Sequence, residues 1–221
     1  MQVRREPSRY TLDRATPEAA ASYNVKYQRF FHKRISNRTE RALLERLLAR
    51  VIPVDSILDV PSGAGRVAGH FYRAARQVIE ADYSLEMLKL LRANLAHETL
   101  RLAAASVFHL PFRDRSFDLV ISIRLSHHIP DEGGRHLHLQ ELMRVSRRFV
   151  LVSFFDSGSL KNRLREQWRR FGMKKRGKYT LSRTAVSALG RRQGFLPIGY
   201  WSLSWLFSGH TFALLERAGV S

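Results

Sequence analysis

The stretch Ile57-Leu-Asp-Val-Pro-Ser-Gly-Ala-Gly-Arg66 decides the fold. It is a short apolar run that ends in a carboxylate and a turn with two glycines. Glycine lets backbone approach a ligand closely, because it has no Cβ. Residues 63–68 satisfy the pattern G-x-G-x-x-G/A, and Asp82 follows about 20 residues later, as in a dinucleotide site. The pattern alone also fits other adenosine-containing cofactors, since each of them has ribose hydroxyls for such an acid.

Strands and helices alternate outward from this stretch. We predict strands at residues 57–60, 78–81, 100–104, 117–123 and 149–155, and helices at residues 66–75, 84–95, 132–145 and 184–192. This alternation predicts an α/β fold, with a mostly parallel sheet covered by helices on both faces. Two further apolar segments, 196–207 and 211–216, predict a closing hairpin around Ser208-Gly209.

The N-terminal part reads as a loose basic arm followed by helices. Residues 18–34 have a helical pattern. The stretch Asn37-Arg-Thr-Glu40 fits an N-cap with a capping-box acid, and it predicts a second helix that ends at Pro53.

Composition limits the classes of protein that remain. A chain of 221 residues with 44% hydrophobic residues suits one globular domain. It has no cysteine, which excludes disulfides, thiolate metal sites and a cysteine nucleophile, and we expect no metal. The N-terminus lacks the apolar core of a secretory signal, so we expect a cytoplasmic protein.

The charge points to an anionic partner. The chain has 38 Lys and Arg against 19 Asp and Glu, a net charge of +19. Such a field favours nucleic acid, an anionic membrane surface or a phosphorylated substrate. The alternative is a set of solvated basic faces with no bound polyanion.

Asp59 separates the cofactor classes. A dinucleotide brings its pyrophosphate to the glycines, where a carboxylate just before them would repel it. S-adenosylmethionine (SAM) instead offers a cationic amino group for Asp59, a carboxylate for a helix N-terminus and a ribose for Asp82.

Three blocks in order resemble a known family: "LDVPSGAGR", "EADYSLEMLKLLR" and "LPFRDRSFDLVISIRLSHHIPD". They look like the class I SAM-dependent methyltransferases, in particular the UbiE-like type 11 group, over residues 55–150 and more weakly to the end. The resemblance implies a Rossmann-like, seven-stranded sheet whose last strand is antiparallel. It implies a single domain over residues 1–221, with the segments 1–52 (arm and helices over the site), 53–155 (SAM-binding core), 156–180 (basic acceptor side) and 181–221 (helix and hairpin).

The resemblance also implies the cofactor site. Asp59, Gly63 and Gly65 match the motif that holds the methionine part, Asp82 matches the ribose acid, and Tyr83 and Met87 neighbour the adenine. Ser106 stands where the family has an Asp, so it keeps a hydrogen bond to the adenine but not the charge. The other predicted cofactor residues are Pro61, Arg66, Val107 and Arg124, with Tyr23 and Arg38 over the methionine carboxylate.

The sequence offers two candidates for a catalytic group. His127 and His128 follow the fourth strand and are the candidates for a general base, since histidine titrates near neutral pH. The alternative is that one packs and the other lines the pocket without proton transfer.

The acceptor side is marked by a basic segment with interleaved aromatic residues. Its candidates are Arg165, Trp168, Arg169, Arg170, Lys174 and Lys175. Three acceptors fit: a phosphorylated glycolipid or lipid-linked intermediate at the inner membrane face, a structured RNA, or a small metabolite. We expect O- or C-methylation rather than N-methylation, and a non-catalytic SAM-binding adaptor stays open as an alternative.

Overall fold

The computed structural model describes residues 31–170, 179–204 and 208–219, with backbone only for residues 31–37, 165–166, 168–170, 204 and 208. Its centre is a seven-stranded sheet in the order β3-β2-β1-β4-β5-β7-β6. The strands are β1 (Ser56–Asp59), β2 (Gln77–Asp82), β3 (Arg101–Ala104), β4 (Phe117–Ser122), β5 (Ser146–Phe155), β6 (Phe195–Ser204) and β7 (Ser208–Arg217). Only β7 runs antiparallel to its neighbours, β5 and β6. The predicted fold class is confirmed.

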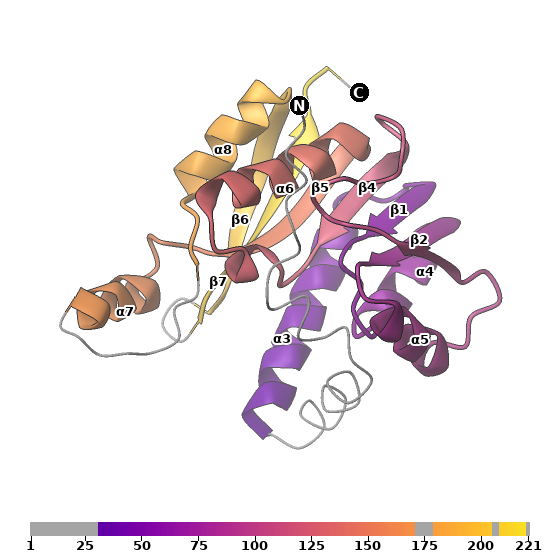
Figure 1. The fold of residues 1–221 in the computed structure, drawn as a ribbon, viewed down its shortest axis with the longest axis horizontal. Helices are drawn as coiled ribbons and strands as arrows, with labels where there is room; N and C mark the ends of the chain where they lie inside the picture. The colour runs from indigo at the N-terminus through magenta and orange to yellow at the C-terminus, as the bar shows by residue number, and fades with distance from the viewer. Residues whose placement is uncertain (1–30, 171–178, 205–207, 220–221) are drawn as a thin grey trace.

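Helices cover both faces of the sheet, as Figure 1 shows. They are α3 (Phe31–Leu48), α4 (Phe71–Ala74), α5 (Leu85–Asn94), α6 (Glu132–Val145), α7 (Leu160–Arg170) and α8 (Arg183–Arg192), with single 3₁₀ turns at Ala68–His70 and Ser126–His128. The helices α6 and α8 pack on one face, and α3 and α4 pack on the other. In Figure 1, α7 projects from the body of the molecule at the left. None of the described helices is long and apolar enough to span a membrane.

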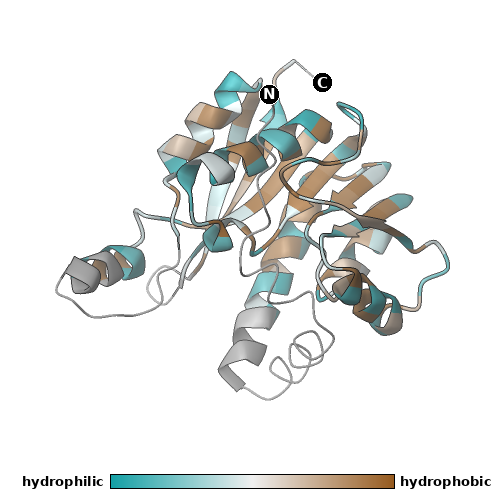
Figure 2. Ribbon diagram, viewed as in Figure 1, coloured by the Kyte–Doolittle hydropathy of each residue, from teal (hydrophilic) through white to brown (hydrophobic). Residues whose placement is uncertain are grey.

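The core lies on the two faces of the central strands. Figure 2 shows these strands as continuously hydrophobic, the pattern expected for parallel strands buried on both sides. Leu58, Val120 and Val150 pack under α6 and α8. Ile57 and Leu119, which alternate with them, pack against α3. The sheet is therefore rigid beneath its carboxyl edge, where its loops gather.

Two sequence predictions about helix starts are wrong. No helix begins at Asn37-Arg-Thr-Glu40, because α3 starts at Phe31 and runs straight through. The predicted helix at 66–75 is reduced to a 3₁₀ turn and the four-residue α4. Its first residues are taken up by turns of the glycine loop, where Gly65 has a φ of +75°. The helix predicted at residues 18–34 lies mostly outside the described residues.

The strand order fixes where a ligand site can form. The chain leaves β1 to build β2 and β3 on one side, and then crosses back to place β4 and β5 on the other. Loops after strands on either side of such a switch point diverge and leave room at the carboxyl edge. The glycine loop after β1, Asp82 at the end of β2 and the histidines after β4 all lie at this edge.

Candidate active site at the carboxyl edge of the sheet

The glycine loop after β1 has two glycines with different roles. Gly63 and Gly65 both have positive φ angles, +56° and +75°. A Cβ added at Gly65 would lie 2.9 Å from Cγ of Leu91 in α5, so this glycine is required by packing. Among the described residues, a Cβ added at Gly63 would meet no atom within 4 Å. In this part of the chain the backbone at Gly63 therefore borders open space in which a ligand can approach it.

Asp82 is held at the end of β2 by backbone donors. One carboxylate oxygen accepts a hydrogen bond from the N–H of Gly63 at 2.9 Å, and the other accepts from the N–H of Ser84 at 2.8 Å. Ser84 in turn caps α5, because its side chain accepts from the N–H of Met87. These bonds fix the carboxylate beside the glycine loop, with lone pairs left for further donors.

Asp59 and Glu80 form a buried pair of carboxyl groups. They are register partners on the parallel strands β1 and β2, so their side chains lie on the same face of the sheet. Asp59 is 2% exposed and Glu80 is fully buried. Burial raises the pKa of Glu80 to about 7. Burial also raises the pKa of Asp59 well above its ordinary range, and the charge of Glu80 raises it further.

Glu40 of α3 ties two loops of the edge together. Its buried carboxylate makes an ion pair of 2.7 Å with Arg66 of the glycine loop. It also accepts two hydrogen bonds, at 2.8 and 2.9 Å, from Arg124 after β4. Burial alone would raise the pKa of Glu40, but the two guanidinium groups outweigh it and hold this pKa below its ordinary value. Helix α3 is thereby locked onto both loops.

The predicted catalytic histidines lie in a cluster of rings after β4. His127 is 5% exposed, and His128 is half-buried. The ring of His127 lies 4.0 Å from that of His128 and 4.6 Å from that of Phe155 at the end of β5. The structure therefore brings both histidines to the carboxyl edge of the sheet.

A third histidine joins this cluster from β7. The ring of His210 lies 6.2 Å from that of His127, and its Nε2 is 3.0 Å from the hydroxyl of Ser153 in β5. The same hydroxyl accepts a hydrogen bond from the backbone N–H of Arg124 at 2.8 Å. These contacts connect the ring cluster to the loop that Glu40 holds.

The remaining predicted cofactor residues take varied positions. Met87 is buried against Ala64 under the glycine loop, while Tyr83 is 41% exposed above α5. Pro61, Ser106 and Val107 are half-buried at the same edge, and Arg38 is exposed on α3. The hydroxyl of Ser106 accepts a hydrogen bond from the N–H of Phe108. Tyr23 lies outside the described residues.

The structure does not describe the side chains of the predicted acceptor-side residues. The side chains of Arg165, Trp168, Arg169 and Arg170, and all of Lys174 and Lys175, lie outside the described part. The first turns of α7 expose Leu160 and Leu164, by 46% and 41%, beside the exposed Lys161 and Arg163. The amide of Asn162 anchors this helix to the carbonyls of Asp156 and Gly209.

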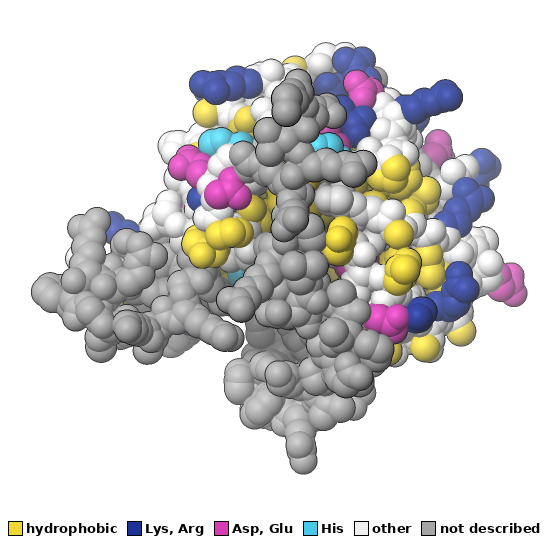
Figure 3. Space-filling view, in the orientation of Figure 1, with side chains coloured by type: hydrophobic (Ala, Val, Ile, Leu, Met, Phe, Trp, Pro, Cys, Tyr) yellow, Lys and Arg dark blue, Asp and Glu magenta, His cyan; other side chains and the backbone are white. Residues whose placement is uncertain are grey.

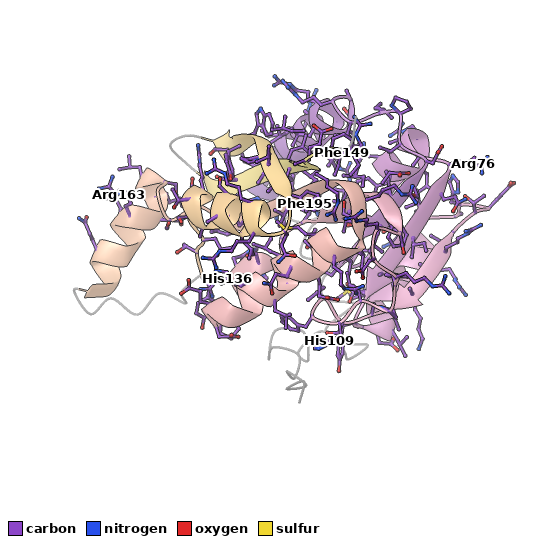
Figure 4. The ribbon with its side chains drawn as sticks, turned by 90° about the horizontal axis from the view of Figure 1, so that it is seen from above. Arg76, His109, His136, Phe149, Arg163 and Phe195 are labelled. Atoms are coloured by element: carbon purple, nitrogen blue, oxygen red, sulfur yellow. The ribbon has the colours of Figure 1, made fainter. Side chains whose placement is uncertain are left out.

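On the face that Figure 3 shows, the described Lys and Arg side chains do not form one patch. Figure 3 shows them spread along the margins of one face. Figure 4 shows Arg163 and Arg76 at opposite ends of the molecule.

Sequence reasoning did not place Glu40, Glu80 or His210 at the site. Glu80 carried a signal, because it is an acid inside the apolar run Val78-Ile-Glu-Ala81. Glu40 also had one, since it shares the apolar face of Leu44 and Leu47 at helical spacing. No local pattern indicated that His210 would meet His127.

Comparison with known proteins finds methyltransferases. The model of a family described as a methyltransferase domain matches residues 58–149. The demethylmenaquinone methyltransferase of Streptomyces avermitilis is 27% identical over 154 residues, which cover 66% of this chain and 64% of that protein. The protein of the same name from Thermobifida fusca is 32% identical over 110 residues, 44% of this chain and 43% of that protein. The aligned part thus spans less than two thirds of either relative.

A solved structure shares the whole fold. The magnesium protoporphyrin IX methyltransferase of Synechocystis PCC 6803, with bound S-adenosylhomocysteine (SAH), has a TM-score of 0.77 at 14% identity, and the match covers 95% of this chain and 98% of that one. These findings confirm the resemblance to the class I, type 11 group and its Rossmann-like sheet.

Proposed function

We propose that this chain, which carries a methyltransferase domain with the class I fold, transfers the methyl group of SAM to an anionic or amphiphilic acceptor. The observation that carries the proposal is the pair of acids beside an open glycine loop. Asp82 is fixed by backbone donors, and Asp59 is buried one strand away.

The residues of this edge fit SAM group by group. Gly63 borders open space, so the methionine part can lie against backbone there. Asp82 offers its carboxylate to the ribose hydroxyls, and the buried carboxyl group of Asp59, directly before the glycine loop, can balance the positive charge of the amino group. The similar structure from Synechocystis holds SAH, the product of SAM after methyl transfer.

The chemistry asks for positioning above all. SAM supplies a methyl group on a sulfonium, which is a good leaving group. The protein then has to align the acceptor and exclude water. The ring cluster of His127, Phe155 and His210 can exclude water from the acceptor side of the site. A base is required only where the acceptor atom carries a proton, as in the O- or C-methylation that we favour.

A general base in the ring cluster would separate catalysis from cofactor binding. The variants His127→Ala and His128→Ala are expected to differ, with the base variant losing at least about 100-fold in turnover. The Kd for SAM should stay within about threefold in both, because neither ring is predicted to bind the cofactor. His109→Ala, at an exposed loop position (Figure 4), is the control. Equal turnover in the wild type and both ring variants would rule out a histidine base.

The acceptor that we propose is an amphiphile with an anionic group, such as a phosphorylated glycolipid or a lipid-linked intermediate. Two exposed leucines flank two exposed basic residues at the start of α7, so an apolar tail and an anionic head could both be contacted there. The names of similar proteins, which refer to demethylmenaquinone and a porphyrin, are consistent with a large ring or lipid-like acceptor. Peripheral association with an anionic inner membrane face is part of this proposal.

Charge reversal on the basic segment tests the acceptor. Changing Arg169, Arg170, Lys174 and Lys175 to Glu should raise the KM for the acceptor at least about tenfold, because each neutralised phosphate contact is worth over 1 kcal/mol. The Kd for SAM should not change. Reversal of Arg73, Arg76, Arg92 and Arg101 near β2 and β3 is a control with the same change in net charge. Unchanged acceptor kinetics in the first variant would argue for a neutral metabolite.

A further inference from the structure

The buried pair Asp59 and Glu80 has unsatisfied hydrogen-bonding capacity. Within the described part of the chain, no donor reaches Oδ1 of Asp59 or either carboxyl oxygen of Glu80. All three atoms are shielded from solvent, although a buried ionised carboxylate normally accepts several hydrogen bonds. Two facing carboxylates cannot supply a donor to each other unless one of them carries a proton.

The surroundings of the pair leave it short of positive charge. Among the described residues, the cation that lowers the pKa of Asp59 is Arg66, and it also pairs with Glu40. Asp82, on the same face of β2, adds a further negative charge beside Asp59. Tyr72 of α4 also has a buried hydroxyl without a partner in the described part. Burial raises the pKa of this hydroxyl and the charges of Glu80 and Asp59 raise it further, so it stays protonated. The register partner of Asp59 on β4 is apolar: it is Ile121, which is fully buried.

We propose that Glu80 and Asp59 share one proton in the free protein, and that the cationic amino group of the cofactor displaces this proton when it binds. This inference deepens the proposed function and rests on it. Glu80 would be a positioning residue: it acts on the ligand through Asp59. The raised pKa values of both acids support a proton that is retained at neutral pH.

The exchange balances in charge and in protons. Before binding, the pair holds one O–H bond and one negative charge. On binding, that O–H bond breaks and the proton passes to the buffer, while the N–H groups of the ammonium become the donors. Both acids are then ionised opposite a positive charge. Since binding releases a proton, affinity must rise with pH over the range in which the free pair is protonated.

The experiment counts released protons without relying on turnover. SAH, which has the amino group but no methyl group to transfer, is titrated into the protein by calorimetry at pH 7.0. Two buffers of different ionisation enthalpy give the number of protons released. The α-amino group of a peptide N-terminus titrates at about 7.7–8.0, and the neighbouring carboxylate of SAH raises the pKa of its amino group above this range, so the ligand is cationic at pH 7.0. With the pKa of Glu80 raised to about 7, we expect release of at least about half a proton per SAH at pH 7.0, and a Kd that falls at least about threefold from pH 6.5 to 7.5.

Two controls assign the proton to this pair. The ligand 5′-methylthioadenosine, which lacks the amino acid part, should bind the wild type with no proton release. The variant Glu80→Gln should bind SAH with no release and a Kd independent of pH, because the amide donates to Asp59 in place of the proton. The exposed Glu98→Gln should behave like the wild type.

The possible failures are distinguishable. SAH binding without proton release by the wild type overturns this inference and leaves the proposed function standing. Release that persists in Glu80→Gln overturns the role of Glu80. A wild type that binds no SAH overturns the proposed function and the inference with it. The comparison of the two ligands uses the wild type alone, so it holds even if Glu80→Gln does not fold.

Discussion

Asp82→Ala is expected to weaken SAM binding at least about 100-fold. A carboxylate that accepts hydrogen bonds from two ribose hydroxyls contributes about 3 kcal/mol, which corresponds to a factor of about 100 in Kd. The same substitution removes the acceptor for the backbone N–H of Gly63, so the glycine loop also loses a hydrogen bond that fixes its position. Calorimetric titration with SAM measures the effect, with a thermal unfolding curve to check that the variant is folded.

Two further variants make this result specific. Asp82→Asn keeps the shape and one oxygen acceptor, and it should lose less affinity than the alanine variant. Asp55→Ala, at the opposite end of β1, removes an exposed acid and should leave the Kd unchanged. An Asp82→Ala protein that is folded and binds SAM within about threefold of the wild type would place the ribose elsewhere.

Glu40→Ala is expected to lower the free energy of unfolding by about 3 kcal/mol, because it leaves the guanidinium groups of Arg66 and Arg124 without the carboxylate that they share. The side chains of Arg66 and Arg124 are 14% and 28% exposed, so water recovers part of the loss and the effect lies at the low end for a buried pair. Glu45→Ala, on the same helix but 60% exposed, should change stability by less than about 0.5 kcal/mol. Urea unfolding followed by circular dichroism measures both.

The stabilisation by Glu40 should depend on pH in a defined direction. Its pKa in the folded protein is lowered, so the unfolded chain takes up the proton first as the pH falls. The contribution is therefore present at neutral pH and is lost as the pH drops through the lowered value. The difference between wild type and Glu40→Ala should shrink below about pH 4.5, the ordinary range of a Glu carboxyl. A difference that is equally large at pH 7 and in that acid range would contradict the ion-pair account.

The sheet and the acid positions could be predicted from the sequence because their signals are local. Apolar runs that end in an acid or a glycine turn identify strands, and Asp59 and Asp82 stand directly at those ends. The helix starts were harder. The sequence Asn37-Arg-Thr-Glu40 matches the capping-box pattern. In the structure, however, the carboxylate of Glu40 forms ion pairs with Arg66 and Arg124, which lie on loops far along the chain. Tertiary ion pairs of this kind leave no local pattern.

The pairing of acids and rings needed the three-dimensional register. Glu80 faces Asp59 only because β1 and β2 are aligned at that residue, and a shift of one residue would send it to the other face. His210 reaches the ring cluster because β7 inserts between β5 and β6. For the acceptor side, the sequence gives the charge and the aromatic content of the residues but not the shape of the binding surface. The identity of the acceptor is therefore a proposal.

The most direct test of the account is the fate of the methyl group. The purified protein is incubated with methyl-labelled SAM and a cell extract, which is then divided by organic extraction and by nuclease treatment. We predict that the wild type transfers label to the organic phase and that the Asp82→Ala variant does not. Label that is lost on nuclease treatment would instead make RNA the acceptor. SAM binding with no transfer of label to any fraction would contradict the enzyme and favour a SAM-binding adaptor.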